Sequence, residues 1–327
     1  MLRQLPRNEY TVGWICALPI ELVAALQMLD ELHADLQHEP GDNDENIYTL
    51  GSIGGHNAAI VCLPAGRIGN NAATAAATQM RAAFREIRFG LMVGVGGGVP
   101  SERADIRLGD VVVSQPDGTF NGVVQYDFGK ITPGGFGRTG ALNAPSQMLL
   151  NAVARVQANE LFGRSKVLER IAKLNHSPRF QRSKAGPDVL FKATYDHEEG
   201  QTCDACRADK QEVRLPRNRE EEVVVHYGTI ASGNQVIKNA RERDKVSEAL
   251  GGVLCFEMEA AGLMNIFPCL VIRGVCDYAD SHKNKQWQAY AAGTAAAYAK
   301  ELLSVIPAAN KIAKTHTVGK ALQETVG

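Results

Sequence analysis

The sequence predicts an α/β fold in which a central mixed sheet, twisted and rich in parallel strands, is the middle of three α/β/α layers. Short apolar runs alternate along the chain with segments of helical periodicity, and continuous apolar runs are typical of strands covered on both faces. The chain has 327 residues, of which 45% are hydrophobic, so it is long enough to bury one large core. We therefore expect a single domain over residues 1–327.

Apolar runs predict the strands of this sheet. The first run is rich in β-forming residues and is followed by a proline, and the last leads into acids. In chain order, the expected strands cover residues 10–17, 57–64, 89–95, 110–114, 223–232, 253–256 and 269–275.

Segments with helical periodicity lie between these runs. Pro19 suits the first turn of a helix, and Leu22, Val23, Leu26 and Leu29 would form the apolar face of that helix. The expected helices cover residues 20–32, 72–84, 143–159, 259–266 and 286–305.

Residues 164–222 differ from the rest of the chain, because they are polar and basic and contain three prolines. We expect them to form a surface insertion in a core made of residues 10–160 and 223–305. The polar end of the chain, residues 309–327, is expected to be a disordered tail.

The balance of charges argues against two classes of partner. Lysine and arginine number 35 and aspartate and glutamate 36, so the net charge is −1 and gives no sign of a nucleic-acid or anionic-membrane surface. Residues 1–10 lack the apolar core of a signal peptide, no apolar run is long enough for a bilayer, and five of the seven cysteines lie in apolar segments. We therefore expect a cytoplasmic protein.

Two acids, Glu257 and Glu259, interrupt an apolar run at residues 255–264. Burying an ionised carboxylate without a partner is costly, so the pair indicates a site rather than a core. A third acid, Asp277, follows Glu259 by eighteen residues and ends a short apolar strand that carries Arg273. Because ligands of open α/β sheets bind at the carboxyl ends of strands, both stretches indicate one pocket.

A glycine-rich segment, residues 94–98, follows another strand. Its glycines would let a ligand approach the backbone closely, or would simply form a tight turn. The dinucleotide-binding pattern requires a glycine where this chain has Val99, so that class of site is excluded. Glu21 lies in the first turn of the first helix, where the helix dipole alone would explain it.

Cys203 and Cys206 form a Cys-x-x-Cys pair, which His197 precedes by six residues. This is half of the ligand spacing of a zinc site, and His176 and His226 are the available fourth donors. The alternative, which we favour from sequence, is a reducible disulfide or two free thiols. We therefore expect no metal in the chemistry and a loop that is dispensable for it.

Several short motifs recur in a fixed order. They are CALPIE at 16–21, GVGGG at 94–98, LGDVVVS at 108–114, FEMEA at 256–260 and RGVCD at 273–277. In combination they resemble the nucleoside phosphorylase/nucleosidase superfamily, which includes purine nucleoside phosphorylases, uridine phosphorylases and methylthioadenosine/S-adenosylhomocysteine nucleosidases. The segments VQYDFGK at 124–130 and YADSHKNK at 278–285 are similar to fungal nucleosidase modules that stand alone or are fused to NOD-like receptors.

The resemblance implies four catalytic residues and a nucleoside phosphorylase-like fold. Asp277 falls on the aspartate that protonates purine N7 as the base departs, and Glu259 on the glutamate that holds the ribose 2′- and 3′-hydroxyls. Glu21 falls on the glutamate with which nucleosidases activate water, and Arg273 on the arginine near that water. Asp277 would then have to hold a proton at neutral pH, while Glu21 would stay ionised.

The resemblance also implies a set of substrate-binding residues. Met258 would pack under the sugar, the backbone around Glu257 would touch the base, and Trp287 would lie beside the base. Val236 stands where bacterial nucleosidases have a phenylalanine that stacks on adenine. The remaining expected contacts are Val95, Gly96, Gly97, Ile237, Arg67 and Tyr126.

Departures from the phosphorylases favour water as the nucleophile. Phosphorylases bind phosphate with arginines and a serine at places where this chain has Met92, Val95 and Glu21, and an ionised Glu21 would repel phosphate. Val95 also replaces a serine that helps to hold water in bacterial nucleosidases. Breaking the glycosidic bond builds positive charge on the sugar and negative charge on the base, which Glu259 and Asp277 would stabilise.

We therefore expect a purine nucleosidase that needs no cofactor and releases the free base from adenosine- or inosine-type nucleosides, with water as co-substrate. One alternative is a phosphate-dependent purine nucleoside phosphorylase. Another is a nucleosidase for adenine nucleotides such as ATP, whose phosphates would meet Arg67, Lys130 and Arg138. A third is a degenerate module that only senses a nucleoside, against which the joint presence of the three acids argues.

The resemblance further implies a homo-oligomer, in which the segment after strand 110–114 closes the sugar pocket of a neighbour. That segment, residues 120–136, would expose Tyr126, Phe128 and Phe136 in an isolated chain, and exposed apolar patches usually mark interfaces. Closed symmetric pairs are the commonest oligomers. We expect a dimer in which Tyr126 reaches the partner's pocket, with a trimer or hexamer as alternatives.

Overall fold

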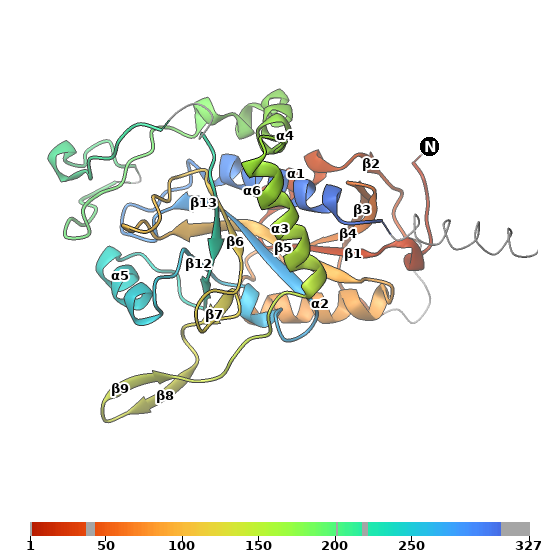
Figure 1. Cartoon of the computed structure of the whole chain (residues 1–327), viewed down its shortest axis with the longest axis horizontal. Helices are drawn as coiled ribbons and strands as arrows, with labels where there is room; N and C mark the ends of the chain where they lie inside the picture. The colour runs from red at the N-terminus through yellow and green to blue at the C-terminus, as the bar shows by residue number, and fades with distance from the viewer. Residues whose placement is uncertain (1, 37–42, 201, 218–221, 309–327) are drawn as a thin grey trace, which may run out of the picture.

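The computed structural model describes residues 2–36, 43–200, 202–217 and 222–308. Its strands, drawn in Figure 1, are β1 (Val12–Cys16), β2 (Glu31–Leu32), β3 (Tyr48–Ile53), β4 (His56–Cys62), β5 (Phe89–Gly98), β6 (Val111–Ser114), β7 (Val123–Gln125), β8 (Gly129–Thr132), β9 (Gly135–Arg138), β10 (Val225–Gly228), β11 (Ile230–Ser232), β12 (Cys255–Glu257) and β13 (Cys269–Asp277). The helices are α1 (Pro19–Met28), α2 (Asn70–Ala83), α3 (Gln147–Leu161), α4 (Val167–Lys173), α5 (Ala240–Ala249) and α6 (Gln288–Val305).

One mixed sheet organises the molecule, with the strand order β10-β6-β13-β5-β1-β4-β3-β2. The central strand β5 is parallel to β13 along one edge and to β1 along the other. Pairing with β1 ends at Met92, and β12 pairs with the same strand in the antiparallel direction at Gly97 and Gly98. Because β13 occupies the other edge as far as Gly97, the β1 edge of β5 is left open between Met92 and Gly97.

Helices cover both faces of this sheet. On one face, α1, α3 and α6 form a core with the inward side chains of the strands, and on the other face α2 and the turn at Ala260–Gly262 form a second core. Every residue of β1, β6 and β13 is buried, as expected for strands covered on both sides. The predicted three-layer α/β/α class with a mixed sheet is therefore confirmed.

The first helix is shorter than the sequence indicated. It ends at Met28 rather than at residue 32, because the chain then turns to pair Glu31 and Leu32 with β3. Its buried side chains are those of Glu21, Ala24, Ala25 and Met28, whereas Val23 is 40% exposed. The predicted leucine face was wrong in part, because α1 packs closely on α6 through its alanines.

The expected helix at 259–266 is also wrong, since only the single turn Ala260–Gly262 forms. The carboxylate of Glu257 accepts the backbone N–H groups of Glu259 and Ala260, which fixes the start of this turn. Gly262 lies so close to Asn70 that a Cβ there would overlap the carbonyl oxygen of Asn70. The glycine-rich segment 94–98 is not a turn either, because it continues β5.

Other elements were absent from the prediction, namely β2, β3, β7, the β8–β9 hairpin, α4 and α5. A break at Thr229 divides the expected strand 223–232 into β10 and β11. Helix α5 had a sequence signal that could have found it. The Asn239 side chain caps the helix by accepting the N–H of Glu242, and Asn followed three residues later by Glu is a typical helix start.

The insertion 164–222 is packed onto the core rather than detached from it. Helix α4 contacts α6. The insertion also contributes Val167, Ile171, Leu174 and Phe180 to the core that contains α6. Figure 1 shows α4 beside α6.

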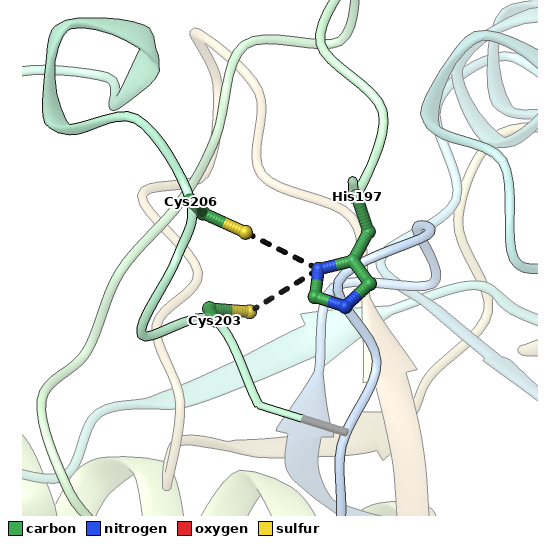
Figure 2. Close-up of side chains that lie close together, drawn as sticks. All are labelled: His197, Cys203 and Cys206. Atoms are coloured by element: carbon green, nitrogen blue, oxygen red, sulfur yellow. Dashed lines mark hydrogen bonds between the residues drawn. The ribbon is translucent and has the colours of Figure 1, made fainter. Parts of the chain in front are cut away.

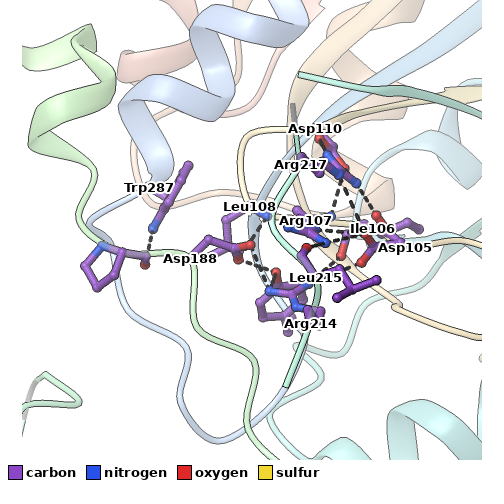
Figure 3. A network of polar contacts seen from close by, with 12 residues as sticks. Asp105, Ile106, Arg107, Leu108, Asp110, Asp188, Arg214, Leu215, Arg217 and Trp287 are labelled. Atoms are coloured by element: carbon purple, nitrogen blue, oxygen red, sulfur yellow. Dashed lines mark hydrogen bonds and ion pairs between the residues drawn. The ribbon is translucent and has the colours of Figure 1, made fainter. Parts of the chain in front are cut away.

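A network of arginines and aspartates fastens the end of the insertion to the sheet (Figure 3). Arg217 Nη1 donates over 2.6 Å to Oδ1 of Asp110, the residue before β6, whereas the bond of 2.8 Å from Arg214 Nη2 to Asp188 Oδ2 lies within the insertion. Arg214 Nη2 also lies 2.9 Å from the hydroxyl of Tyr278. Since Tyr278 leads out of β13, the insertion contacts the loop that follows this strand.

Two further expectations concern the C-terminal tail and membrane-spanning helices. The predicted tail, residues 309–327, lies outside the described residues. Among the helices that the structure describes, none has the length and hydrophobicity needed to cross a bilayer.

Candidate active site

A cavity opens where the carboxyl ends of β1, β5, β12 and β13 converge. Its titratable side chains include those of Glu21, Glu257, Glu259, Asp277 and Lys283. The sequence had indicated the acids but not the lysine. The location agrees with the general position of ligand sites in open α/β sheets.

Glu21 fills the open edge of β5. Its Oε2 accepts the backbone N–H groups of Ala17 (2.7 Å) and Leu18 (3.0 Å), and its Oε1 accepts that of Val95 (2.8 Å). The side chain therefore caps α1 and satisfies a strand N–H that has no partner strand. Burial raises the pKa of Glu21, although Arg273 and the three N–H groups oppose the shift.

Arg273 is fully buried behind the cavity, among three carboxylates. Its Nη2 is paired with Glu257 Oε2 and lies 3.2 Å from Glu259 Oε2, and its Nη1 lies 3.5 Å from the carbonyl of Val95. Arg273 does not line the cavity, so it acts through the acids that it holds. Its Nε has no partner among the described residues.

Glu259 lines the cavity, as do Glu21 and Glu257 of the same cluster. Its Oε1 accepts the N–H of Gly69 over 3.1 Å and its Oε2 faces Arg273. Burial raises the pKa of Glu259 to about 7, since the attraction of Arg273 is opposed by the neighbouring Glu257 and Glu21. The carboxylate is therefore poised to titrate near neutrality, with lone pairs left for a ligand.

Asp277 reaches the cavity through an irregularity in β13. The register against β5 shifts between Val275 and Asp277, and a bulge of this kind re-aims a side chain. Its Oδ1 accepts the N–H of Ala279 over 2.9 Å, and its Oδ2 lies 2.6 Å from Nζ of Lys283. Ala279 has a φ of 50°, which is rare for a residue with a side chain.

The Asp277–Lys283 pair is largely screened from solvent. The side chain of Asp277 is 3% exposed and that of Lys283 is 28% exposed. Burial alone would lower the pKa of Lys283, but Asp277 outweighs burial and the pKa is raised. The lysine is therefore a cation, and the pair places its ammonium beside the carboxyl group of Asp277 at the same end of the cavity.

The glycines of β5 make room for these side chains. A Cβ on Gly94 would meet both Arg273 and Glu21, and a Cβ on Gly97 would lie 2.8 Å from Asp277 Oδ1. One on Gly96 would overlap the sulfur of Cys255 in β12. Gly96, Gly97 and Val95 also line the cavity, as expected.

An apolar wall completes the cavity. Met258, Val236 and Ile237 line it as expected, together with Phe256 and Ile68, which the sequence did not single out. Val236 is 47% exposed, so it lies toward the mouth. The wall can accept a flat apolar ring between the two groups of charged side chains.

Three expected contacts lie elsewhere. Trp287 is buried beside a neighbouring cavity, where its Nε1 donates to the carbonyl of Pro187. Arg67 is exposed. Tyr126 was expected to be exposed, but it is partly buried, because it packs on Phe256 of its own chain with ring centroids 5.5 Å apart.

Two cations near Asp277 were missed in the sequence. Lys283 lies in a polar stretch where nothing distinguishes it from a solvated lysine. Arg243, 4% exposed, lies in the missed helix α5, and its Nη1 donates to the carbonyl of Tyr278 over 2.9 Å. It steadies the backbone that follows Asp277, and finding it required recognising the cap at Asn239.

Within the described residues, the one group suited to hold a metal ion consists of His197, Cys203 and Cys206, in the insertion. It lies apart from the cavity that contains Glu21 and Glu259. The acids of the cavity are held by N–H groups and cations of the chain itself.

Comparison with known proteins places the chain in context. A family model described as "Phosphorylase superfamily" matches residues 11–307. A nucleotide-binding leucine-rich repeat (NLR)-like protein from Hyaloscypha variabilis is 49% identical over 305 residues, which make up 92% of this chain and 30% of that protein. The chain thus spans less than a third of that relative. A 5′-methylthioadenosine/S-adenosylhomocysteine nucleosidase from Mycobacterium bovis is 25% identical over 91% of this chain and 97% of its own.

Solved structures share the fold at lower identity. A 5′-methylthioadenosine/S-adenosylhomocysteine nucleosidase from S. pneumoniae, bound to a transition-state inhibitor, aligns with a TM-score of 0.57 and 17% identity, covering 91% of this chain and all of that one. The futalosine hydrolase of Helicobacter pylori aligns with a TM-score of 0.56 and 18% identity, covering 90% and 97%.

We predict that Glu259→Gln weakens the dependence of thermal stability on pH. An acid whose pKa is higher in the folded than in the unfolded chain stabilises the fold at low pH and loses this contribution as the pH rises through the folded value. With a folded pKa of about 7, Glu259 should lower the Tm as the pH rises from about 5 to about 8. The fall should persist in part, because burial also raises the pKa of Glu21.

Melting curves across this pH range check the prediction. Glu248→Gln, which changes an exposed acid on α5, is the matched control and should follow the wild type. If the Tm of Glu259→Gln falls with rising pH as steeply as that of the wild type, Glu259 does not titrate in the folded chain as described.

Proposed function

Because the chain belongs to the phosphorylase superfamily, we propose that it is a purine nucleosidase, which hydrolyses an adenosine- or inosine-type nucleoside to the free base and ribose. The observation that carries the proposal is the meeting of Glu21, Glu259 and Asp277 around one cavity. The nucleosidase relatives support hydrolysis as the type of reaction.

Glu259 would hold the sugar. As a carboxylate it can accept hydrogen bonds from two neighbouring hydroxyls while Gly69 N–H and Arg273 keep it in place. Its negative charge would also stabilise the positive charge that develops on the ribosyl ring as the bond breaks.

The Asp277–Lys283 pair would serve the departing base. Asp277 would donate the proton to the base nitrogen, and Lys283, at 2.6 Å, would supply the positive charge that offsets the charge left behind. The apolar wall of Phe256, Met258 and Val236 would hold the ring of the base between these ends.

Glu21 would take a proton from the attacking water. It is buried with a raised pKa, which makes it a stronger base than an exposed glutamate. Phosphate is disfavoured as the nucleophile, because Met92 is fully buried in the core and Arg273 is already paired with acids. Lys283 is the remaining cation among the described residues that line the cavity, and Asp277 occupies it.

The test is a panel of nucleosides and nucleotides incubated in phosphate-free buffer, with chromatography of the products. We expect free purine base and ribose from nucleosides, at a rate that added phosphate does not raise. Ribose 1-phosphate as the main product would make the protein a phosphorylase. Release of base from ATP alone would move the substrate class to nucleotides, and binding without turnover would leave a sensing module.

We predict that Asp277→Asn lowers kcat by about 10²–10⁴-fold, because an amide cannot donate the acid's proton. Substrate binding should change much less, which an inhibitor titration can measure. Asp280→Asn is the matched control, since Asp280 lies in the same loop but outside the cavity, and an amide oxygen can still accept the N–H of His282. Near-normal kcat in Asp277→Asn would remove Asp277 from the mechanism.

We also propose that the chain forms a homo-oligomer through the β8–β9 hairpin, which projects from the body of the molecule (Figure 1). Phe128, Ile131 and Phe136 on this hairpin are 58%, 85% and 50% exposed. Such a group of exposed apolar side chains on one projection is typical of an interface.

Light scattering at assay concentration should show a mass of two or more chains. Ile131→Lys should lower that mass, because it puts a charge into the apolar contact, whereas Ile47→Lys changes another exposed isoleucine (89%) and should not. A wild-type chain that is monomeric and fully active would refute the proposal.

A further inference from the structure

We propose that His197, Cys203 and Cys206 bind a zinc ion that braces the loop beside Asp277. The three side chains converge although His197 is separated from the cysteines by a loop, and their ligand atoms all lie within 4.8 Å of one another. Figure 2 shows the two sulfur atoms directed at the same ring nitrogen of His197. None of these residues belongs to the cavity described above.

The distances fit tetrahedral coordination. With Zn–S bonds of about 2.3 Å and Zn–N bonds of about 2.0 Å, a sulfur and a nitrogen ligand lie about 3.5 Å apart. Here Nδ1 of His197 is 3.2 Å from Sγ of Cys206 and 4.0 Å from Sγ of Cys203. Shifts of about half an ångström would bring the three atoms onto one ion.

The imidazole is already oriented as a ligand. Its second nitrogen, Nε2, lies 3.1 Å from the carbonyl oxygen of Gly200, to which it can donate. This bond fixes the tautomer that leaves the Nδ1 lone pair free toward the sulfurs, as is usual for histidines that bind metals.

The two cysteines are held in a turn that suits chelation. The backbone N–H of Cys206 donates to the carbonyl of Cys203 over 3.1 Å, which brings both thiols to one side. A Cys-x-x-Cys turn with a histidine is a donor set that favours zinc among common divalent ions. Three protein ligands leave a fourth position for water.

The fourth donors considered from the sequence are committed elsewhere. Nε2 of His226 is 2.9 Å from Asp110 Oδ2 in the sheet, and His176 is exposed in the turn after α4. The sequence-based preference for a disulfide or free thiols rested on the missing fourth protein donor, and the convergence of three ligand atoms outweighs it.

The site is joined to the loop that carries Lys283. The N–H of His197 donates to Ser281 Oγ over 2.9 Å, and Sγ of Cys203 lies 3.7 Å from the carbonyl oxygen of His282, to which it can donate only while no metal is bound. The rings of His197 and His282 meet edge to face, with centroids 5.6 Å apart. A bound ion would thus brace residues 280–284, and with them the lysine paired with Asp277, without taking part in the reaction.

The first test is the zinc content of the full chain, purified in reductant without metal-affinity chromatography or added metal. We expect about one zinc per chain, and about tenfold less in the double variant Cys203→Ser/Cys206→Ser and in His197→Ala. The matched controls, Cys62→Ser and His176→Ala, change a cysteine and a histidine outside the cluster and should retain the metal.

The second test follows the loop itself. Removing zinc with a chelator should speed amide hydrogen exchange in residues 195–207 and 278–284 and lower the Tm, and Zn²⁺ added back should reverse both changes. Both readouts are independent of catalysis, so they hold even if the proposed function fails. A reduced chain that lacks zinc and takes up none on titration, or a native Cys203–Cys206 disulfide, would overturn the proposal.

Discussion

The buried guanidinium of Arg273 is the interaction on which the rest of the site depends. Burying each ion alone would cost several kcal/mol, and Glu21, Glu257 and Glu259 all lie in the field of this one cation. These acids do more than pair with it. Glu257 holds the turn after β12, Glu21 caps α1 and closes the open edge of β5, and Glu259 binds the segment before α2. The guanidinium therefore keeps together segments that are far apart in the sequence.

Room for this cluster comes from the glycines of β5. Side chains at Gly94, Gly96 and Gly97 would collide with Arg273, Cys255 and Asp277 respectively. From the sequence, the glycines could serve a ligand or a turn. In the structure they continue a strand and admit the protein's own side chains, which is a role that only the neighbouring strands β12 and β13 make visible.

The sequence was sufficient where a pattern is local or where burial is costly. Continuous apolar runs predicted the central strands, and acids inside such runs predicted the pocket that contains Glu259 and Asp277. It failed where a local bond competes with periodicity, as when the Glu257 carboxylate limits the next helix to one turn. Prediction from the sequence also failed where a segment far away in the chain sets the position of a side chain. Trp287 is an example, because the carbonyl of Pro187 in the insertion binds it away from the cavity. Lys283 gave no signal, because its partner is defined by the bulge in β13.

The single positive charge of Arg273 does not neutralise the three carboxylates around it. The excess negative charge therefore lies at one end of the cavity. Burial raises the pKa of both Glu21 and Glu259, and repulsion by Glu257 and Glu21 adds to the rise for Glu259, so the cavity disfavours additional negative charge beside Arg273. Under the proposed function, a neutral nucleoside in the ground state would relieve little of this repulsion. A ribosyl group that becomes cationic as the bond breaks would relieve much more, so the acids would favour the transition state over the substrate. At the opposite end, a protonated Asp277 would give its proton to the base and be left as a carboxylate paired with the ammonium of Lys283, so no isolated charge would remain. The cavity is thus negative where the sugar would gain positive charge and able to donate a proton where the base would gain negative charge.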